Sequence, residues 1–223
     1  LLSRRQRQMC IRDRPEDCAE KVLDILHVSA SYGTHDIFKD LTMHIKKGET
    51  VGLIGPNGAG KTTLLKLITG EKQPDSGIVQ IGNNVKIGYY SQEQEMLHPE
   101  YQVIDEVRNM FNYGEGEARN ILGMFLFRGD DVFKQVGMLS GGEKARLSLL
   151  CLFLEIPNFL ILDEPTNHLD IPTREIMEDA ILAFGGTCLV VSHDRYFLDK
   201  TAGRILDMEG GKLTEYLGNY SYY

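Results

Sequence analysis

Residues 159–170 read FLILDEPTNHLD, an apolar, strand-like run that ends in two adjacent carboxylates, Asp163 and Glu164. A pair of acids at the end of a buried strand is costly to desolvate unless a cation or another partner binds there. We therefore expect this stretch to meet a positively charged group.

Residues 55–62 read GPNGAGKT and match the phosphate-loop pattern G-x-x-x-x-G-K-[ST] in full. Glycines let such a loop turn tightly enough to aim successive N–H groups at phosphate oxygens, and the helix that follows adds the positive end of its dipole. A glycine-rich turn with an exposed lysine is the alternative, but such a turn requires neither Lys61 nor Thr62. The predicted nucleotide-binding residues of this loop are Gly55, Asn57, Gly58, Gly60, Lys61, Thr62 and Thr63.

The phosphate loop supplies the partner that the acid pair needs. Lys61 is expected to neutralise the β- and γ-phosphates, while Thr62 and Asp163 hold Mg²⁺. Glu164 is expected to point elsewhere, because side chains alternate along a strand, and to orient or deprotonate the water that attacks the γ-phosphate. Alternatively, Glu164 has no catalytic role and is simply the first residue of the turn after the strand. The predicted chemistry is Mg²⁺-dependent hydrolysis of a nucleoside triphosphate.

The order of the surrounding elements predicts an α/β fold. Strand-like runs dominate the first third of the chain, at residues 22–32, 36–45, 50–55, 77–82 and 85–90. Helical patterns follow at 103–111 and 116–127, and strands at 159–163, 186–191 and 204–208 then alternate with helices at 142–155, 172–184 and 194–200. Such alternation favours a mostly parallel sheet flanked by helices. We expect a P-loop NTPase core with an N-terminal antiparallel β subdomain and a helical insert at about residues 93–150.

Composition is that of an ordinary globular protein. The chain has 223 residues, of which 42% are hydrophobic, and a formal net charge of −8. The first fourteen residues hold five Arg and one Asp, so the rest of the chain is more acidic than this total, which argues against a broad footprint on a phosphate backbone. Residues 1–16 are expected to lie outside the domain, as a basic arm or a segment foreign to the fold, and residues 17–223 to form the domain.

The sequence shows no signal for membrane insertion or secretion. No run of about 18 apolar residues occurs in it, and residues 1–14 lack the apolar core of a signal peptide. The four cysteines, at positions 10, 18, 151 and 188, show no CxxC spacing. We interpret them as reduced thiols of a cytoplasmic protein, with Cys151 and Cys188 in its core.

Taken together, these motifs resemble an ATP-binding cassette (ABC) domain, specifically one of the ABC-F subfamily, over residues 22–223. The resemblance rests on GPNGAGKT, on LILDE at 160–164, on LSGGE at 139–143, on Gln92 after VKIGYYS, on NHLD at 167–170 and on SHDRYFLD at 192–199. The wording of VKIGYYSQE, FRGDDVF and LSGGEKARLSLL is most like a second, C-terminal cassette. Members of this subfamily carry two cassettes joined by a long charged helical linker, so the resemblance implies a fragment or an isolated domain.

The resemblance also implies roles for residues outside the phosphate loop. Ser140, Gly141 and Gly142 are expected to bind the γ-phosphate held by a second cassette, although Ser140 can also cap its helix in a box closed by Glu143. Gln92 is expected to ligate Mg²⁺ or position the attacking water, and an ordinary surface glutamine is the alternative.

Other implied roles have structural alternatives too. His193 is expected to stabilise transition-state charge, with a purely structural histidine as the alternative. Tyr32 is expected to stack on adenine, and a core tyrosine competes with that interpretation. Asn167 and Asp170 are expected either to touch the opposite cassette or to cap the helix that contains Pro172.

These inferences predict a cytoplasmic ATPase cassette that uses ATP and Mg²⁺, pairs with a second cassette and acts on the ribosome or RNA through its parent protein. The motor subunit of an ABC transporter is the alternative, and it would present a groove in the helical insert to a membrane protein. A regulatory ATP-binding module with little turnover is a third possibility, which Glu164 and His193 disfavour.

Overall fold

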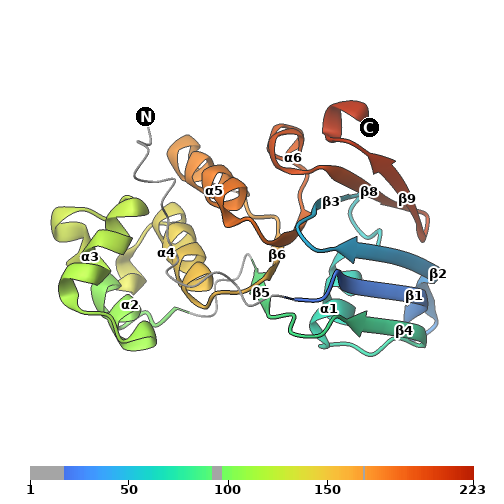
Figure 1. Cartoon of the computed structure of the whole chain (residues 1–223), viewed down its shortest axis with the longest axis horizontal. Coiled ribbons are helices and arrows are strands. Elements are labelled where there is room, and N and C mark those ends of the chain that lie inside the picture. The colour runs from blue at the N-terminus through green and yellow to red at the C-terminus, as the bar shows by residue number, and fades with distance from the viewer. Residues whose placement is uncertain (1–17, 92–96, 168) are drawn as a thin grey trace. The chain divides into compact units, whose positions relative to one another are not determined.

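The computed structural model of the protein describes residues 18–91, 97–167 and 169–223. The chain divides into two compact units. We name them the sheet unit, which comprises the described parts of residues 15–89, 157–165 and 185–223, and the helical unit, which comprises those of 90–156 and 166–184 (Figure 1).

The main sheet of the sheet unit is mostly parallel, as the sequence predicts. Its strand order is β5 (Ile87–Tyr90), β6 (Phe159–Asp163), β7 (Thr187–Val191), β3 (Thr50–Ile54), β8 (Arg204–Glu209) and β9 (Lys212–Leu217). Strand β3 runs parallel to β7 and β8, and β6 runs parallel to β7, whereas β9 is antiparallel to β8. All five residues of β7 are buried, which explains the continuous apolar runs, because parallel strands are covered on both faces.

A second sheet contains three antiparallel strands, and this confirms the predicted N-terminal β subdomain. Its order is β2 (His35–Lys46), β1 (Lys21–Tyr32) and β4 (Ser76–Ile81). Along the second half of β2, buried and exposed residues alternate, as expected when one face of a strand packs on a core and the other meets water.

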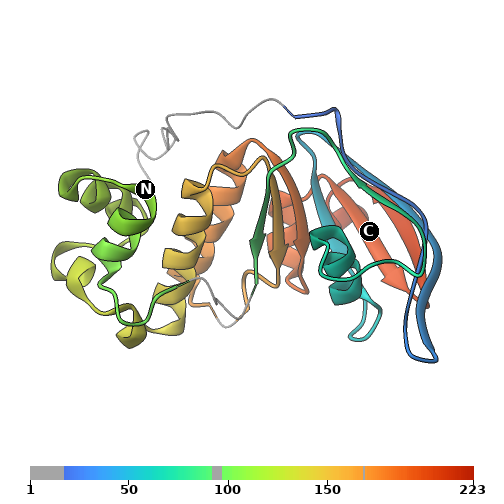
Figure 2. The same ribbon diagram turned by 90° about the horizontal axis from the view of Figure 1, so that it is seen from below.

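Helix α1 (Lys61–Thr69) lies between the two sheets (Figure 2). Its residues Leu64 and Leu65 belong to one core cluster with residues from both sheets, for example Ile25 of β1 and Leu53 of β3. Helix α6 (Arg195–Thr201) approaches β3 closely, since a Cβ atom added to Gly52 would lie 3.0 Å from Leu198 Cδ2. These contacts fix the direction in which β3 delivers the phosphate loop.

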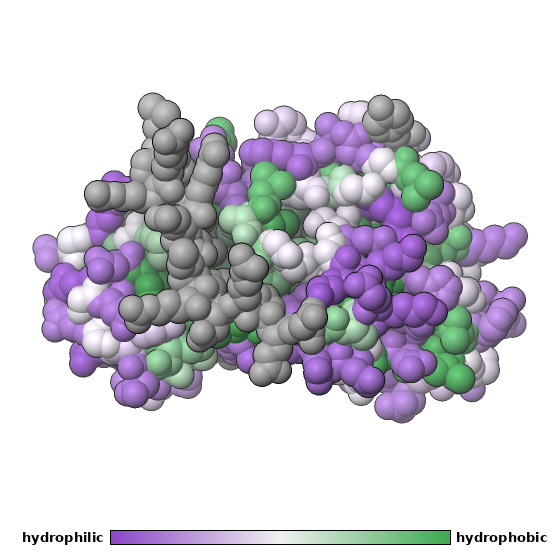
Figure 3. All heavy atoms as spheres, in the orientation of Figure 1, coloured by the Kyte–Doolittle hydropathy of each residue, from purple (hydrophilic) through white to green (hydrophobic). Residues whose placement is uncertain are grey.

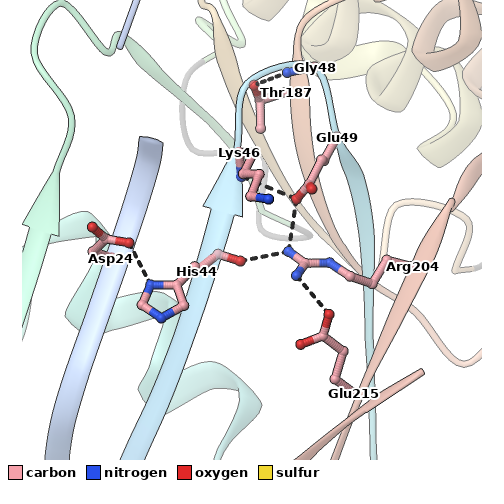
Figure 4. Close-up of polar contacts among 8 residues, drawn as sticks. All are labelled: Asp24, His44, Lys46, Gly48, Glu49, Thr187, Arg204 and Glu215. Atoms are coloured by element: carbon pink, nitrogen blue, oxygen red, sulfur yellow. Dashed lines mark hydrogen bonds and ion pairs between the residues drawn. The ribbon is translucent and has the colours of Figure 1, made fainter. Parts of the chain in front are cut away.

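Arg204 fastens the turn that precedes β3 (Figure 4). Its guanidinium donates hydrogen bonds to the His44 carbonyl at 2.6 Å, to Glu49 at 2.9 Å and to Glu215 at 3.0 Å. Glu49 also accepts a hydrogen bond from the Lys46 backbone. One side chain at the start of β8 therefore joins β2, β9 and the turn between β2 and β3.

In its described residues, the helical unit contains the helices α2 (Val103–Phe111), α3 (Glu115–Met124), α4 (Gly141–Leu154) and α5 (Ile171–Phe184). The 3₁₀ segments η2 (Gly129–Phe133) and η3 (Val136–Met138) connect α3 to α4, and η4 (Tyr220–Tyr222) lies near the end of the sheet unit. The helix predicted at 116–127 ends earlier, at Met124, because Leu126 adopts a left-handed φ of 64° that no α-helix continues through.

Apolar residues are largely inside each unit. Cys151 and Cys188 are buried and unpaired, which confirms the prediction that they fill the core, and burial raises the pKa of each thiol to about 12. On the face shown in Figure 3, hydrophobic residues form small separate patches among hydrophilic ones. In the described part of the chain, no helix is both long and apolar enough to cross a membrane.

Candidate functional site

The phosphate loop, residues 55–60, connects β3 to α1 and depends on two glycines. Gly55 has a φ of 144°, and a Cβ atom there would collide with the Met208 carbonyl oxygen. Gly60 has a φ of 108°, and a Cβ atom there would lie 2.6 Å from Cγ2 of Ile37. Any side chain at either position would therefore distort the loop.

The loop leaves the start of α1 open to an anion. Gly60 is the N-cap residue, no side chain caps this helix, and its first turn contains no acid. The N–H groups and the positive end of the helix dipole therefore have no negative partner from the helix itself. Asn57, Gly58 and Thr62 are exposed, whereas Thr63 is buried.

Lys61 folds back into the loop. Its Nζ atom donates hydrogen bonds to the carbonyl oxygens of Gly55, at 2.7 Å, and Pro56, at 3.1 Å. Only 9% of the surface of Lys61 is exposed, and this burial lowers the pKa of its ammonium. The nearby negative charges of Glu164 and Asp163 raise that pKa and so act in the opposite direction. The ammonium is thus held where a phosphate bound by the loop would meet it.

The acid pair lies at the end of β6. Burial raises the pKa of Asp163, against the lowering effect of a 3.5 Å hydrogen bond from the Tyr89 hydroxyl and of the Lys61 charge. Burial also raises the pKa of Glu164, against the effect of hydrogen bonding to His193. Each carboxylate would gain from a bound cation, since a positive charge offsets desolvation.

The direction of Glu164 has a different cause from the one predicted. The strand ends at Asp163, so alternation along a strand does not apply, and Glu164 instead has a φ of 48°. A non-glycine residue in this left-handed region is strained by roughly 1–3 kcal/mol. Its backbone N–H donates to the Val191 carbonyl at 2.8 Å, which holds the turn in place.

His193 completes a cluster with Lys61 and Glu164. Its Nε2 atom lies 3.4 Å from Lys61 Nζ and 3.5 Å from Oε1 of Glu164, and its backbone N–H donates to Oε2 of Glu164 at 3.3 Å. The three residues follow β3, β6 and β7, which are neighbours in the sheet. An imidazole, a carboxylate and a fixed ammonium are therefore grouped at the carboxyl ends of adjacent parallel strands.

Tyr32 is not a core residue. It is 50% exposed at the end of β1, which excludes the alternative that placed it in the core. The Nζ atom of Lys72 lies 4.7 Å from the centroid of its ring. A cation that the sequence motifs did not identify thus lies over one face of this half-exposed ring.

Helix α4 begins with a capping box, as the structural alternative predicted. Ser140 Oγ accepts a hydrogen bond from the Glu143 backbone, and the Glu143 carboxylate accepts one from the Ser140 backbone. Although burial acts in the opposite direction, hydrogen bonds from the backbone and hydroxyl of Ser140 and from Lys134 lower the pKa of Glu143 to about 2. Gly141 is exposed and Gly142 is half-buried beside this cap.

Asp170 acts locally in the way that its capping alternative predicted. Its Oδ1 atom accepts a hydrogen bond from the Thr173 backbone in the first turn of α5, at 3.0 Å. Asn167 is exposed. Gln92, the remaining predicted ligand, and His168 of the NHLD run lie outside the described residues.

The oxygen donors near the phosphate loop suit a divalent cation only together with a ligand. Mg²⁺ prefers carboxylate and hydroxyl oxygens combined with phosphates, and Thr62 and Asp163 provide one of each. Among the residues that the structure describes, no group of three His, Cys, Asp or Glu could hold a metal ion. Thr62 and Asp163 thus supply the kind of oxygen donors that Mg²⁺ prefers.

Two contacts of the site depend on the tertiary fold and could not be predicted from the sequence motifs. Tyr89 reaches Asp163 because β5 pairs with β6, and tyrosine is too common in strands to signal this from sequence. Lys72 reaches Tyr32 from the loop after α1, where a lysine is unremarkable.

Comparison with known proteins gives consistent results. A family model described as ABC transporter matches residues 38–167. The chain is 45% identical to YdiF of Bacillus subtilis, over 95% of this chain and 33% of YdiF. It is 44% identical to the energy-dependent translational throttle protein EttA of Haemophilus influenzae, over 92% of this chain and 38% of EttA. It is also 40% identical to ABC transporter F family member 5 of Arabidopsis thaliana, over 91% of this chain and 30% of that protein.

The chain thus spans about a third of the length of these relatives. The matching part of each is its first cassette, which contradicts the predicted resemblance to a second, C-terminal cassette. Membership of these relatives in the ABC-F group agrees with the predicted subfamily.

Solved structures share the fold. The ATP-binding subunit of an ABC transporter superposes with a TM-score of 0.76 at 23% identity, over 88% of this chain and 90% of that one. A dimeric ATP-binding cassette in a post-hydrolysis state with ADP and phosphate superposes with a TM-score of 0.71 at 24% identity, over 87% of this chain and 98% of that one. The predicted α/β P-loop NTPase architecture is therefore confirmed.

Proposed function

This chain belongs to the ABC transporter family, and we propose that it is one cassette that binds ATP with Mg²⁺ and hydrolyses it. The observation that carries the proposal is the cluster of Lys61, Glu164 and His193, in which His193 Nε2 lies within 3.5 Å of both other side chains. This cluster adjoins an uncapped helix start and a loop that only glycine can form at two positions.

We assign each residue of the site a separate role in nucleotide binding or hydrolysis. The phosphate loop and Lys61 bind and neutralise the phosphates, Thr62 and Asp163 hold Mg²⁺, and the base stacks on Tyr32. Bound Mg²⁺ supplies neutralisation of the charge that develops on the phosphate oxygens. Glu164 orients or deprotonates the attacking water, and the rise in its pKa that burial causes makes the carboxylate a stronger base.

His193 and Gln92 complete the proposed site. His193 stabilises the charge of the transition state, which its distance of 3.4 Å from Lys61 Nζ supports. Gln92 ligates Mg²⁺ or positions water, as its place after VKIGYYS implies. We assign the cassette to residues 17–223, with a helical insert at about 93–150.

The proposed reaction requires two cassettes. Ser140, Gly141 and Gly142 contact the γ-phosphate held by a second copy or by another cassette of the parent protein, and ATP shifts the population towards the paired state. One relative is named as a translational throttle protein. On that basis we extend the proposal to a cytoplasmic protein that acts on the ribosome.

Glu164→Gln tests the enzymatic part of the proposal. The variant keeps the size and polarity of the side chain but removes the base, so phosphate release should fall by about 10²–10⁴-fold while ATP affinity stays within a few fold. Glu20→Gln, at an exposed position just before β1, is the control and should release phosphate like the wild type. Undiminished release by Glu164→Gln would rule out the assigned role.

Two further measurements test pairing and partner. Phosphate release per molecule should increase with chain concentration, and strict proportionality of total release to concentration would contradict pairing. Glu164→Gln in a protein with two cassettes should cosediment with ribosomes in ATP. Retention on membranes instead would favour the motor subunit of a transporter.

A further inference from the structure

Within the helical unit, the start of α5 packs directly against the first turn of α4. A Cβ atom added to Gly142 would lie 3.3 Å from Oγ1 of Thr173 and 3.8 Å from Oδ1 of Asp170. A methyl group there would press on the threonine hydroxyl, because 3.3 Å is shorter than an ordinary van der Waals contact. Gly142 therefore permits the close approach of the two helix starts.

Arg146 ties these two segments together. Its Nη1 atom donates a hydrogen bond to Oγ1 of Thr173 at 2.6 Å, and Thr173 is 1% exposed. Hydrogen bonds from the side chain and the backbone of Thr173 lower the pKa of Asp170, and the charge of Arg146 adds to this effect. A line of polar contacts thus runs from α4 through Thr173 to Asp170.

The guanidinium of Arg146 also packs against an aromatic ring. Its Cζ atom lies 5.5 Å from the ring centroid of Phe127, which is 2% exposed. The Nε atom of Arg146 is buried and has no hydrogen-bond partner among the described residues. Since an unsatisfied buried donor destabilises the fold, an apolar side chain would stabilise this place at least as well. A role in placing α5 explains the arginine better than stability does.

We propose that Arg146 is a positioning residue that locks the start of α5 against the first turn of α4, so that Asp170 and residues 140–142 form one rigid surface. In one respect this rests on the proposed function, because that surface is the part expected to meet the nucleotide of a second cassette. The lock itself is a property of this chain alone and needs no nucleotide.

Amide hydrogen exchange in the nucleotide-free chain tests the lock. Arg146→Ala and Thr173→Val both remove the 2.6 Å hydrogen bond, and Thr173→Val preserves the shape of the side chain. Both variants should raise exchange in the first turns of α4 and α5 by roughly fivefold or more, whereas the control Lys144→Ala, on the same helix, should not. Unchanged exchange in Thr173→Val would overturn the proposal even if Arg146→Ala failed to fold.

Phosphate release at matched ATP occupancy tests whether the lock positions the surface. Both variants should bind ATP with wild-type affinity, because the phosphate loop belongs to the other unit, and should release phosphate roughly tenfold more slowly. Arg146→Lys retains a donor and should recover part of the rate. Wild-type release by variants whose exchange has risen would overturn the positioning role. If the wild-type chain released no phosphate, the proposed function would be wrong. Hydrogen exchange alone would then test whether Arg146 holds the start of α5 against α4.

Discussion

The Nζ atom of Lys61 lies 3.4 Å from Nε2 of His193, although 132 positions separate the two residues in the sequence. They meet because Lys61 follows β3, His193 follows β7, and these strands are neighbours in the parallel sheet. The contact joins the loop of residues 55–60 to the segment after β7, and we expect substitutions of Lys61 and of His193 to have different effects.

Lys61→Met should weaken ATP binding by about 100-fold, since the ammonium lies in the loop that we propose binds the phosphates and charge-assisted contacts are worth about 1.5–3 kcal/mol each. Titration of a fluorescent ATP analogue measures this affinity. Lys66→Met, at an exposed position of the same helix, should bind within a few fold of the wild type. An equal loss in both variants would mean that Lys61 acts only through the stability of α1.

His193→Ala should reduce phosphate release about 10²–10³-fold and leave ATP affinity within a few fold, because its ring contributes where charge develops and not to the ground state. Steady-state kinetics with separate determination of kcat and KM distinguishes the two effects. A rise in KM with an unchanged kcat would contradict the proposed role and indicate a residue that only binds substrate.

Asp163→Asn should stabilise the nucleotide-free chain. Burial raises the pKa of Asp163, so the folded chain holds this proton more tightly than the unfolded chain, and the ionised carboxylate opposes folding at neutral pH. The thermal midpoint should rise by about 2–4 °C for each kcal/mol gained in a chain of this size, while the dependence of ATP binding on Mg²⁺ is lost. The wild type should approach the stability of the variant as the pH falls towards the raised pKa.

The matched control for that experiment is Asp36→Asn, which removes an exposed ion pair with Lys39 in the same unit. Its effect on the midpoint should be small, because exposed pairs contribute about 0–1 kcal/mol. A lower midpoint in Asp163→Asn than in this control would show that Asp163 supports the empty fold.

Glu143 should make the stability of the helical unit sensitive to acid. Its pKa is lowered from 4.5 to about 2, so its hydrogen bonds stabilise the fold fully above the unfolded pKa and are lost as the pH falls from about 4.5 towards 2. Thermal unfolding followed by circular dichroism between pH 6 and pH 3 measures this loss. In Glu143→Gln the slope over this range should be smaller, and an unchanged slope would show that other carboxylates cause it.

Arg204→Met should destabilise the sheet unit by about 2–3 kcal/mol, between the values for exposed and for buried ion pairs, because three acceptors each lose one hydrogen bond at once. Urea unfolding measures the change. Lys39→Met removes only the exposed pair with Asp36 and should cost less than about 1 kcal/mol. Equal losses would mean that the Arg204 contacts add nothing beyond a surface pair.

Most of the sheet could be predicted because its signals are local. The run TVGLI of β3 is apolar throughout and passes directly into the glycine-rich loop, so both the strand and the phosphate site follow from adjacent residues. The capping box of α4 is also local, since Ser140 and Glu143 are three positions apart.

The features that sequence reasoning missed depend on contacts between distant segments. Glu164 adopts a left-handed φ because its N–H bonds the carbonyl of Val191, on the neighbouring strand, and no propensity of glutamate indicates this conformation. Arg146 meets Thr173 through the packing of α4 on α5, which depends on how the two helices are rotated. The 3₁₀ segments between α3 and α4 lack a periodic pattern long enough to detect.

The bare first turn of α1 has a thermodynamic consequence. In many helices a side-chain oxygen accepts a hydrogen bond from a backbone N–H of the first turn, but no side chain does so in α1. A bound anion would therefore accept hydrogen bonds from the free N–H groups at the start of α1. Ordering of the phosphate loop and binding of the anion would then be one coupled equilibrium. The heat resistance of the protein should then follow its degree of saturation, and a substitution that only loosens the backbone there would weaken affinity without removing any contact to the ligand.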